Sequence, residues 1–345
     1  TGVFSQTYIR ADGRDAQGVA SRVDLSSLTD LGGARGAVSA SNGGVVDLPV
    51  LQTITATSLL ASGGSTLDAS NATSYTGGNG FVSTVQADGE NSVVNLAGLT
   101  AFAGATGVQG YTTFYTNVNA YGGGLVDLST TAAITNQTRV YATGMDGQAT
   151  PSRVDLASLT QLAGGARGQS LSVSDVGVID VPQLTDVTHS SLVASNGGTL
   201  DVSGVTSYDG GNGFAHTIQA SGEGSFVDLS GLPSFAGATG VQGHTTFYTN
   251  INAIDGGVVD LSATDSIANQ TRVTASGMDS PGVPSRIDLA SLTQLAGRAR
   301  GHQLSLSDVA PHHAPPPVHL PPATLAPTHD RTLGLPHAPP LPAHL

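Results

Sequence analysis

The chain has no cysteine, no tryptophan and no lysine among its 345 residues, and only 11% of the residues are charged. Without cysteine there are no disulfides, no thiolate metal sites and no cysteine nucleophiles. Twelve arginines face 25 acidic residues, which gives a net charge of −13. So little basic charge excludes a nucleic-acid binder, because such a protein must neutralise phosphates. No apolar run approaches the roughly 20 residues of a membrane-spanning helix, so we expect no membrane span.

The sequence contains a long internal repeat. Residues 98–120 return as residues 231–253, a shift of 133 in numbering, with four differences in 23 positions. Residues 5–28 match residues 136–159 at a shift of 131. The first residue, Thr1, brings neither an initiator methionine nor a signal-peptide pattern. We therefore expect a soluble piece of a longer repeat protein, with two long copies and the end of a third.

A shorter unit lies inside each long copy, an apolar–acid–apolar triplet that is usually Val-Asp-Leu. The spacings between successive triplets run 23, 21, 27, 32, 28 and then 25, 21, 27, 32, 28, so the unit lengths repeat in the order of the long copy. A period of about 20 to 50 residues is typical of stacked repeat architectures. The centre of the triplet is occupied in turn by Asp24, Asp47, Asp68, Asn95, Asp127, Asp155, Asp180, Asp201, Asp228, Asp260 and Asp288.

Strand alternation around each triplet places its two apolar residues on one face and the acid on the other. Paired glycines such as Gly43-Gly44 mark tight corners that need positive φ. A leucine-rich repeat has a similar period, but the segments between triplets are rich in Gly, Ser, Thr and Asn, which disfavour its helices. We therefore predict an all-β parallel β-solenoid over residues 1–309, with about eleven coils of 21–32 residues and a length of about 50 Å.

The recurring Gly-Gly-x-Val-Asp-Leu-Ser coils, for example at residues 43–54 and 256–267, resemble the β-strand repeat proteins of bacterial cell surfaces. These include secreted proteins of planctomycete type and adhesin-like solenoids, and the resemblance covers about residues 5–309. It implies a secreted or cell-surface protein with a structural or adhesive role. The partners it implies are flanking coils of the same larger protein, cell-surface glycans or further copies of the chain. It brings no catalytic motif.

Stacked coils would bring the triplet acids into one column with a spacing of about 4.8 Å. Two unit charges at that distance repel by about 0.9 kcal/mol in water, and by more where shielding is weaker. Three arrangements offset this repulsion: hydrogen bonds from backbone N–H groups or serines, pairing with Arg22, Arg153 or Arg286, or bound Ca²⁺. We predict a hydrogen-bonded structural ladder without a cofactor or metal, and calcium remains the alternative.

Polysaccharide lyases and hydrolases are also built on parallel β-helices, so an enzyme that acts on polysaccharides is an alternative function. Glycoside hydrolysis needs two carboxylates across one cleft, in different environments. Here the acids repeat in nearly identical surroundings, and the two glutamates of the chain, Glu90 and Glu223, occupy equivalent positions of two copies. We therefore predict no enzymatic activity and assign no catalytic residue.

Aromatic residues cluster beside threonine and asparagine in the longest units, at Phe114 and Tyr115 and again at Phe247 and Tyr248. Aromatic faces with polar neighbours suit carbohydrate, so these four residues form a candidate glycan-contact surface. The other interpretation is that they cover the core beneath a long insertion. Both interpretations remain open at the level of the sequence.

Three histidines, His189, His216 and His244, are scattered singly along the repeats and are predicted to lie at the surface. The repeat pattern then stops, and residues 310–345 contain 11 of the 17 prolines. Proline removes backbone donors and fixes φ, so we predict a disordered Pro/His-rich tail after the solenoid. The sharpness of the change favours out-of-frame translation of a gene that originally continued the repeats.

Overall fold

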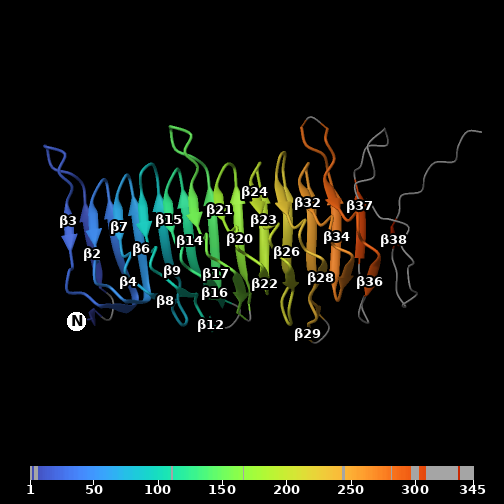
Figure 1. The fold of residues 1–345 in the computed structure, drawn as a ribbon, viewed down its shortest axis with the longest axis horizontal. Helices are drawn as coiled ribbons and strands as arrows, with labels where there is room; N and C mark the ends of the chain where they lie inside the picture. Colours follow the sequence, from blue (N-terminus) through green and yellow to red (C-terminus); the bar gives the residue numbers. More distant parts are fainter. Residues whose placement is uncertain are drawn as a thin grey trace, which may run out of the picture.

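The computed structural model describes residues 2–3, 7–109, 112–165, 167–242, 245–280, 282–296, 303–307 and 333–334. Within these residues the chain forms strands and turns, and the strands follow one another along a rod in sequence order (Figure 1). Nearly all strand pairs are parallel and join successive coils. The all-β parallel β-solenoid predicted from the sequence is confirmed. Apart from residues 333–334, the predicted tail lies outside the described residues.

One wall of the solenoid consists of the short strands that carry the acid triplets, in two parallel sheets of seven and four strands. The first sheet contains β3 (Arg22–Asp24), β5 (Val45–Asp47), β7 (Thr66–Asp68), β10 (Val93–Asn95), β15 (Leu125–Asp127), β18 (Arg153–Asp155) and β21 (Val178–Asp180). The second sheet contains β24 (Thr199–Asp201), β27 (Phe226–Asp228), β32 (Val258–Asp260) and β35 (Arg286–Asp288).

The remaining walls belong to one 23-stranded sheet, in which two strands of each coil pair with their counterparts in the next coil. The longer strands are β2 (Tyr8–Asp12), β9 (Ser83–Asp88), β14 (Thr116–Tyr121), β17 (Thr138–Thr143), β20 (Gln169–Ser174), β23 (Ser190–Ser195), β26 (His216–Ser221), β31 (Thr249–Ile254), β34 (Thr271–Ser276), β37 (Gln303–Ser307) and its short neighbour β38 (Leu333–Gly334). The shorter strands are β1 (Gly2–Val3), β8 (Ser74–Thr76), β11 (Ala101–Ala103), β16 (Ala133–Asn136), β19 (Gln161–Gly164), β22 (Asp186–Thr188), β25 (Ser207–Asp209), β28 (Ser234–Ala236), β33 (Ser266–Ala268) and β36 (Gln294–Ala296). Strands β4 (Asp30–Ser41) and β6 (Thr53–Ser62) run through both walls, and the register of their pairing shifts between Gly32 and Gly36.

The longest units leave the solenoid wall as small antiparallel hairpins. One is formed by β12 (Val108–Gln109) and β13 (Thr112–Thr113), and the other by β29 (Val241–Gln242) and β30 (Thr245–Thr246). The two hairpins belong to equivalent coils of the two long copies. Each hairpin ends just before a longer strand begins, before β14 in one coil and before β31 in the other. The hairpins therefore lie at the edge of the rod where the longer strands start.

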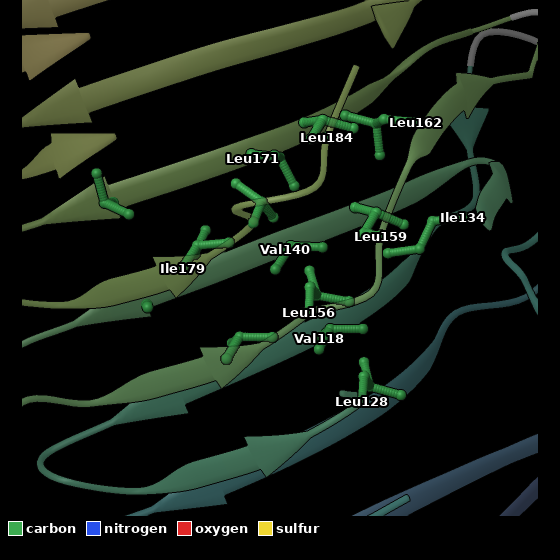
Figure 2. Packing of buried hydrophobic residues seen from close by; sticks show 14 of the residues in the cluster. Val118, Leu128, Ile134, Val140, Leu156, Leu159, Leu162, Leu171, Ile179 and Leu184 are labelled. Atoms are coloured by element: carbon green, nitrogen blue, oxygen red, sulfur yellow. The ribbon is translucent and has the colours of Figure 1, made fainter. Parts of the chain in front are cut away.

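The core is made of rows of like residues that follow the strand register (Figure 2). Val118 pairs with Val140, and Val140 pairs with Leu171 in the next coil. All three are buried. A second row contains aromatic pairs, and the rings of Tyr75 and Phe102 stack with centroids 4.7 Å apart. Burial of these rows in every coil supplies the hydrophobic stabilisation, at about 25 cal/mol per Å² of apolar surface removed from water.

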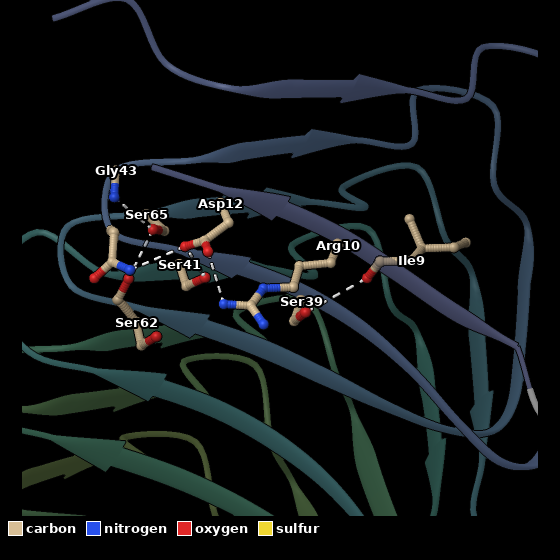
Figure 3. A network of polar contacts seen from close by, with 9 residues as sticks. Ile9, Arg10, Asp12, Ser39, Ser41, Gly43, Ser62 and Ser65 are labelled. Carbon is tan, nitrogen blue, oxygen red and sulfur yellow. Dashed lines mark hydrogen bonds and ion pairs between the residues drawn. The ribbon is translucent and has the colours of Figure 1, made fainter. Parts of the chain in front are cut away.

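The glycine pairs serve the corners in two different ways. Gly43 adopts a φ of 81°, and a Cβ on Gly44 would lie 2.6 Å from the backbone oxygen of Ala11 in the preceding coil. The first glycine is therefore required by conformation and the second by the close approach of two coils. A buried serine from the following coil completes the corner, because Gly43 N donates to Ser65 Oγ at 2.9 Å (Figure 3). The same bond is repeated at Ser92, Ser152, Ser225 and Ser285.

Candidate functional site

The triplet acids lie in register along the rod. Asp24 pairs with Asp47, Asp47 with Asp68, and Asp68 with Asn95. The register continues to Asp180 in the seven-stranded sheet. It is found again in the four-stranded sheet, from Asp201 to Asp288. The column is thus a repeated feature of the wall in which each acid has the same place in its coil.

Most of these side chains accept a hydrogen bond from the backbone N–H two residues further on. In the coil of Asp127 the donor is Ser129 N, at 3.0 Å from Oδ1. The bond closes a tight turn at the end of the strand, as Asp and Asn side chains commonly do. The N–H dipole also stabilises the negative charge of the carboxylate. The side chains with this bond are Asp68, Asn95, Asp127, Asp155, Asp201, Asp228, Asp260 and Asp288.

Two acids of the column differ because proline stands at the donor position. Pro49 follows Asp47 and Pro182 follows Asp180 at a spacing of two, and proline has no N–H to donate. Both carboxylates are instead reached by an arginine from the preceding coil. Arg22 pairs with Asp47. Arg153 Nη2 lies 2.5 Å from Asp180 Oδ2. It also lies 3.2 Å from the Oδ2 of Asp155, which belongs to the same strand as Arg153.

The acids of the described residues do not gather into a chemical site. No group of three or more His, Asp or Glu side chains in the described part of the chain has the arrangement of a metal site. Glu90 and Glu223 sit at equivalent exposed corners five coils apart, which at about 4.8 Å per coil is a separation of roughly 24 Å. Glu90 accepts a hydrogen bond from Gln148 Nε2 at 2.7 Å. The triplet column and the two glutamates thus occupy repeated, separate positions.

The four aromatic residues of the candidate glycan surface are divided between the two hairpin coils. Phe114, Tyr115 and Phe247 are partly buried, and Tyr248 is buried. Each tyrosine ring is covered by an arginine of the next coil. The Arg139 guanidinium carbon lies 3.8 Å from the centroid of Tyr115, and Tyr248 has the same contact with an arginine at 3.9 Å. One face of each tyrosine ring is therefore used in a cation–π contact, and the two hairpin coils lie far apart along the rod.

A pocket of about 220 Å³ lies beside Tyr115, at the edge where the longer strands begin. It is bounded by Arg139 from β17 and by Arg167 from the segment before β20. The Arg167 guanidinium carbon lies 4.7 Å from the centroid of the Phe214 ring, and Tyr115 donates its hydroxyl to the Arg167 carbonyl at 3.3 Å. The remaining lining residues are Gly168, Gln169, Ser170, Ser191, Ala215 and His216.

His216 is 4% exposed, and its ring stacks on that of His189 with centroids 6.2 Å apart. Burial lowers the pKa of His216 to about 4, with a smaller contribution from His189 in the same direction, while Asp209 acts in the opposite direction. The imidazole is therefore neutral near pH 7. The Nδ1 atom of His189 lies 3.3 Å from the Gly164 carbonyl.

The sequence-based interpretation of these histidines needs correction. His189 and His216 are not isolated surface residues, because the stacking of neighbouring coils brings their rings into contact. His189 directly precedes β23, and His216 begins β26, which pairs with β23. The two histidines therefore lie at the same edge in neighbouring coils. His244 lies outside the described residues. The role of Pro49 and Pro182 was not predicted either, although their spacing from the acids is visible in the sequence.

Comparison with known proteins found no matching family model, no matching curated protein and no matching solved structure. Within the described residues, no helix has the length and apolar character to cross a membrane. The function of the chain is therefore inferred from its own geometry.

Proposed function

We propose that the chain is a non-catalytic rod segment of a large extracellular bacterial surface protein, with a structural or adhesive role. The observation that carries the proposal is the register: neighbouring coils pair in parallel, with the triplet positions and the core rows in line along the rod. Each added coil extends such a rod by about 4.8 Å. A repeat architecture of this kind changes length by whole units without a new fold, because the strand pairing that holds the rod together joins each coil to the next.

The chemistry of the acid column supports a structural role over a catalytic one. A catalytic carboxylate needs an environment that sets its pKa apart from that of its neighbours. The column acids instead accept the same backbone hydrogen bond in most coils and receive an arginine where proline removes the donor. These two kinds of contact recur along the wall, and neither gives one acid of the column surroundings of its own.

The proposal can be tested by lengthening the rod. A second copy of residues 137–269 inserted after Asn269 adds one complete long repeat, and its junction reproduces the Asn136–Gln137 junction. We expect small-angle X-ray scattering to give a maximum dimension larger by about 24 Å, with an unchanged cross-sectional radius. A wider cross-section would contradict the rod. Turnover of acidic polysaccharides by the purified chain would contradict its non-catalytic character.

A further inference from the structure

We propose that the pocket between Arg139 and His216 binds the carboxylate-bearing sugar of an acidic saccharide. This inference goes beyond the rod function, since it assigns a ligand to one place on the rod. The pocket volume of about 220 Å³ lies below the range of about 300 to 1,000 Å³ typical of sites for drug-sized ligands. The pocket therefore suits one sugar ring, with the rest of a chain lying outside.

The charge of the pocket is opposite to that of the molecule. The whole chain has a net charge of −13, yet Arg139 and Arg167 line this one pocket. Neither guanidinium forms an ion pair with a carboxylate of the described residues. Two unpaired guanidinium groups beside one cavity create a local positive potential on an acidic rod.

The two guanidinium groups are also held in place. Arg139 lies over Tyr115 at 3.8 Å, and Arg167 lies over Phe214 at 4.7 Å. Stacking uses the face of a guanidinium and leaves the N–H groups at its edge available. Those edge groups match a planar carboxylate through two parallel hydrogen bonds. Because the aromatic rings fix the arginines beforehand, less side-chain entropy is lost when a ligand binds.

Small hydroxyl residues form the floor between the arginines and the histidine. Ser170 pairs with Arg139 in the strand register, and Ser191 pairs with Ser170. Ser191 Oγ accepts a hydrogen bond from Thr217 N at 3.0 Å, so its own hydrogen remains to be donated. Gln169 also lines the pocket, and its buried Oε1 has no donor within the described part of the chain. Its Nε2 donates to the carbonyls of Ile134 and Ala163, so the amide is held in place beside the pocket.

The first long copy provides a natural comparison, because its equivalent coils lack three of these groups. Tyr8 occupies the position of Arg139 at the shift of 131. Ala37 replaces Ser170, and Ser83 replaces His216, at the shift of 133. The stacking of coils is retained there, so these pocket groups are not required by the solenoid. They distinguish this place on the rod from its equivalent in the first copy, whereas the tyrosine–arginine contact recurs at Tyr248 and Arg272.

The test is a calorimetric titration of the full chain with glucuronate, with glucose and inorganic sulfate as comparison probes. We expect saturable binding of glucuronate, no binding of glucose, and weaker binding of sulfate. The double variant Arg139→Gln/Arg167→Gln should weaken glucuronate binding by at least about tenfold, since it removes two charge-assisted contacts. The double variant Arg10→Gln/Arg14→Gln makes the same change of net charge at the first copy, and should bind within about twofold of the parent.

Three results would overturn the assignment: no saturable binding of glucuronate, an equal loss in both double variants, or sulfate binding as tight as that of glucuronate. The last result would indicate a site for free inorganic anions. Equal melting midpoints of parent and variants establish that a loss of binding is not a loss of folding. A second readout follows the His216 ring resonances by NMR, which should shift on addition of glucuronate. Rod length, measured by scattering, is independent of these outcomes.

Discussion

The coils around Tyr75 and those around Tyr208 occupy equivalent places in two long copies, and their interiors are nearly the same. The Tyr75 ring stacks on Phe102 at 4.7 Å, and the Tyr208 ring stacks on Phe235 at 4.6 Å. Each tyrosine hydroxyl donates to a backbone carbonyl of a neighbouring strand. Burial raises the pKa of Tyr75 to about 12 and raises that of Tyr208 as well. The buried tyrosines therefore make the same ring and hydroxyl contacts in both copies.

The edges of the same coils differ. His189 stands where the first copy has Ala56, and both residues adopt positive φ, at 48° and 55°. His216 stands where the first copy has Ser83. The backbone conformation is retained while the side chains change from small to aromatic and titratable. The stacking of coils therefore constrains the residues of the core, whereas residues at the edge can change in size and charge without loss of the fold.

The largest effect is expected where the copies agree. Phe102→Ala and Phe235→Ala each remove a fully buried ring from an aromatic stack. Such substitutions cost about 3 to 5 kcal/mol, and we expect the two losses to be equal within about 1 kcal/mol because the surroundings repeat. Urea denaturation followed by circular dichroism measures both. A much smaller loss at one position would show that the two interiors are not equivalent.

Much of this agreement was predictable from the sequence. The spacing of the triplets around Asp24 and its ten counterparts indicated the number and order of coils, because the side-chain period of a strand and the chain repeat point to the same register. The ladder position of the acids followed from the same spacing. The corner serines such as Ser65 were not predicted, since their partner is a backbone N–H one coil away and no local pattern indicates it.

The pocket beside Tyr115 was not predicted from the sequence. Tyr115 was singled out for its aromatic ring, but its contacts come from Arg139 and from the Arg167 carbonyl, which lies 52 residues further along the chain. Residues so far apart in the sequence can be recognised as neighbours only when the pairing of the strands beside them is known. The depth of a side chain at the edge depends on loops whose length differs from one coil to the next.

The next effect is expected where the copies differ, in the pH dependence contributed by His216. Its pKa in the folded chain is about 4 against 6.5 for the unfolded chain. The unfolded state therefore binds a proton first as the pH falls, so the stability due to neutral His216 is complete above about 6.5. It is lost progressively down to about 4. The loss is on the order of 3 kcal/mol, since one pKa unit corresponds to about 1.4 kcal/mol.

The variant His216→Ser installs the residue of the first copy, and should flatten the fall in unfolding free energy between pH 6.5 and 4. Denaturant titrations at several pH values check this. The carboxyl groups of Asp12, Asp30 and Asp146 have pKa values lowered mainly by hydrogen bonds, and their effects lie below about pH 4. An unchanged slope in the variant would show that His216 is not the titrating group.

The smallest effect concerns the arginine–proline exception, which both copies share. Arg153 and Asp180 are 45% and 36% exposed, so their ion pair should contribute about 0.5 to 1 kcal/mol. Arg153→Met should therefore cost about that much. In a Pro182→Ala background the cost should fall, because residue 182 regains an N–H that Asp180 can accept in the way the other column acids do. Equilibrium unfolding of the four proteins in this double-mutant cycle isolates the coupling between the two positions.

The equivalent cycle in the first copy uses Arg22→Met and Pro49→Ala around Asp47, and should give a coupling of the same sign and size. Arg286→Met is the matched control. Its neighbour Asp288 already accepts the Ala290 N–H at 3.1 Å, and the Arg286–Asp288 contact is longer, at 3.6 Å. We expect that substitution to change stability by less than about 0.3 kcal/mol. If the arginines substitute for the N–H that proline lacks, a coupling energy appears in both cycles, and each arginine substitution costs more than Arg286→Met. Purely additive effects would show that arginine and proline occur together for unrelated reasons.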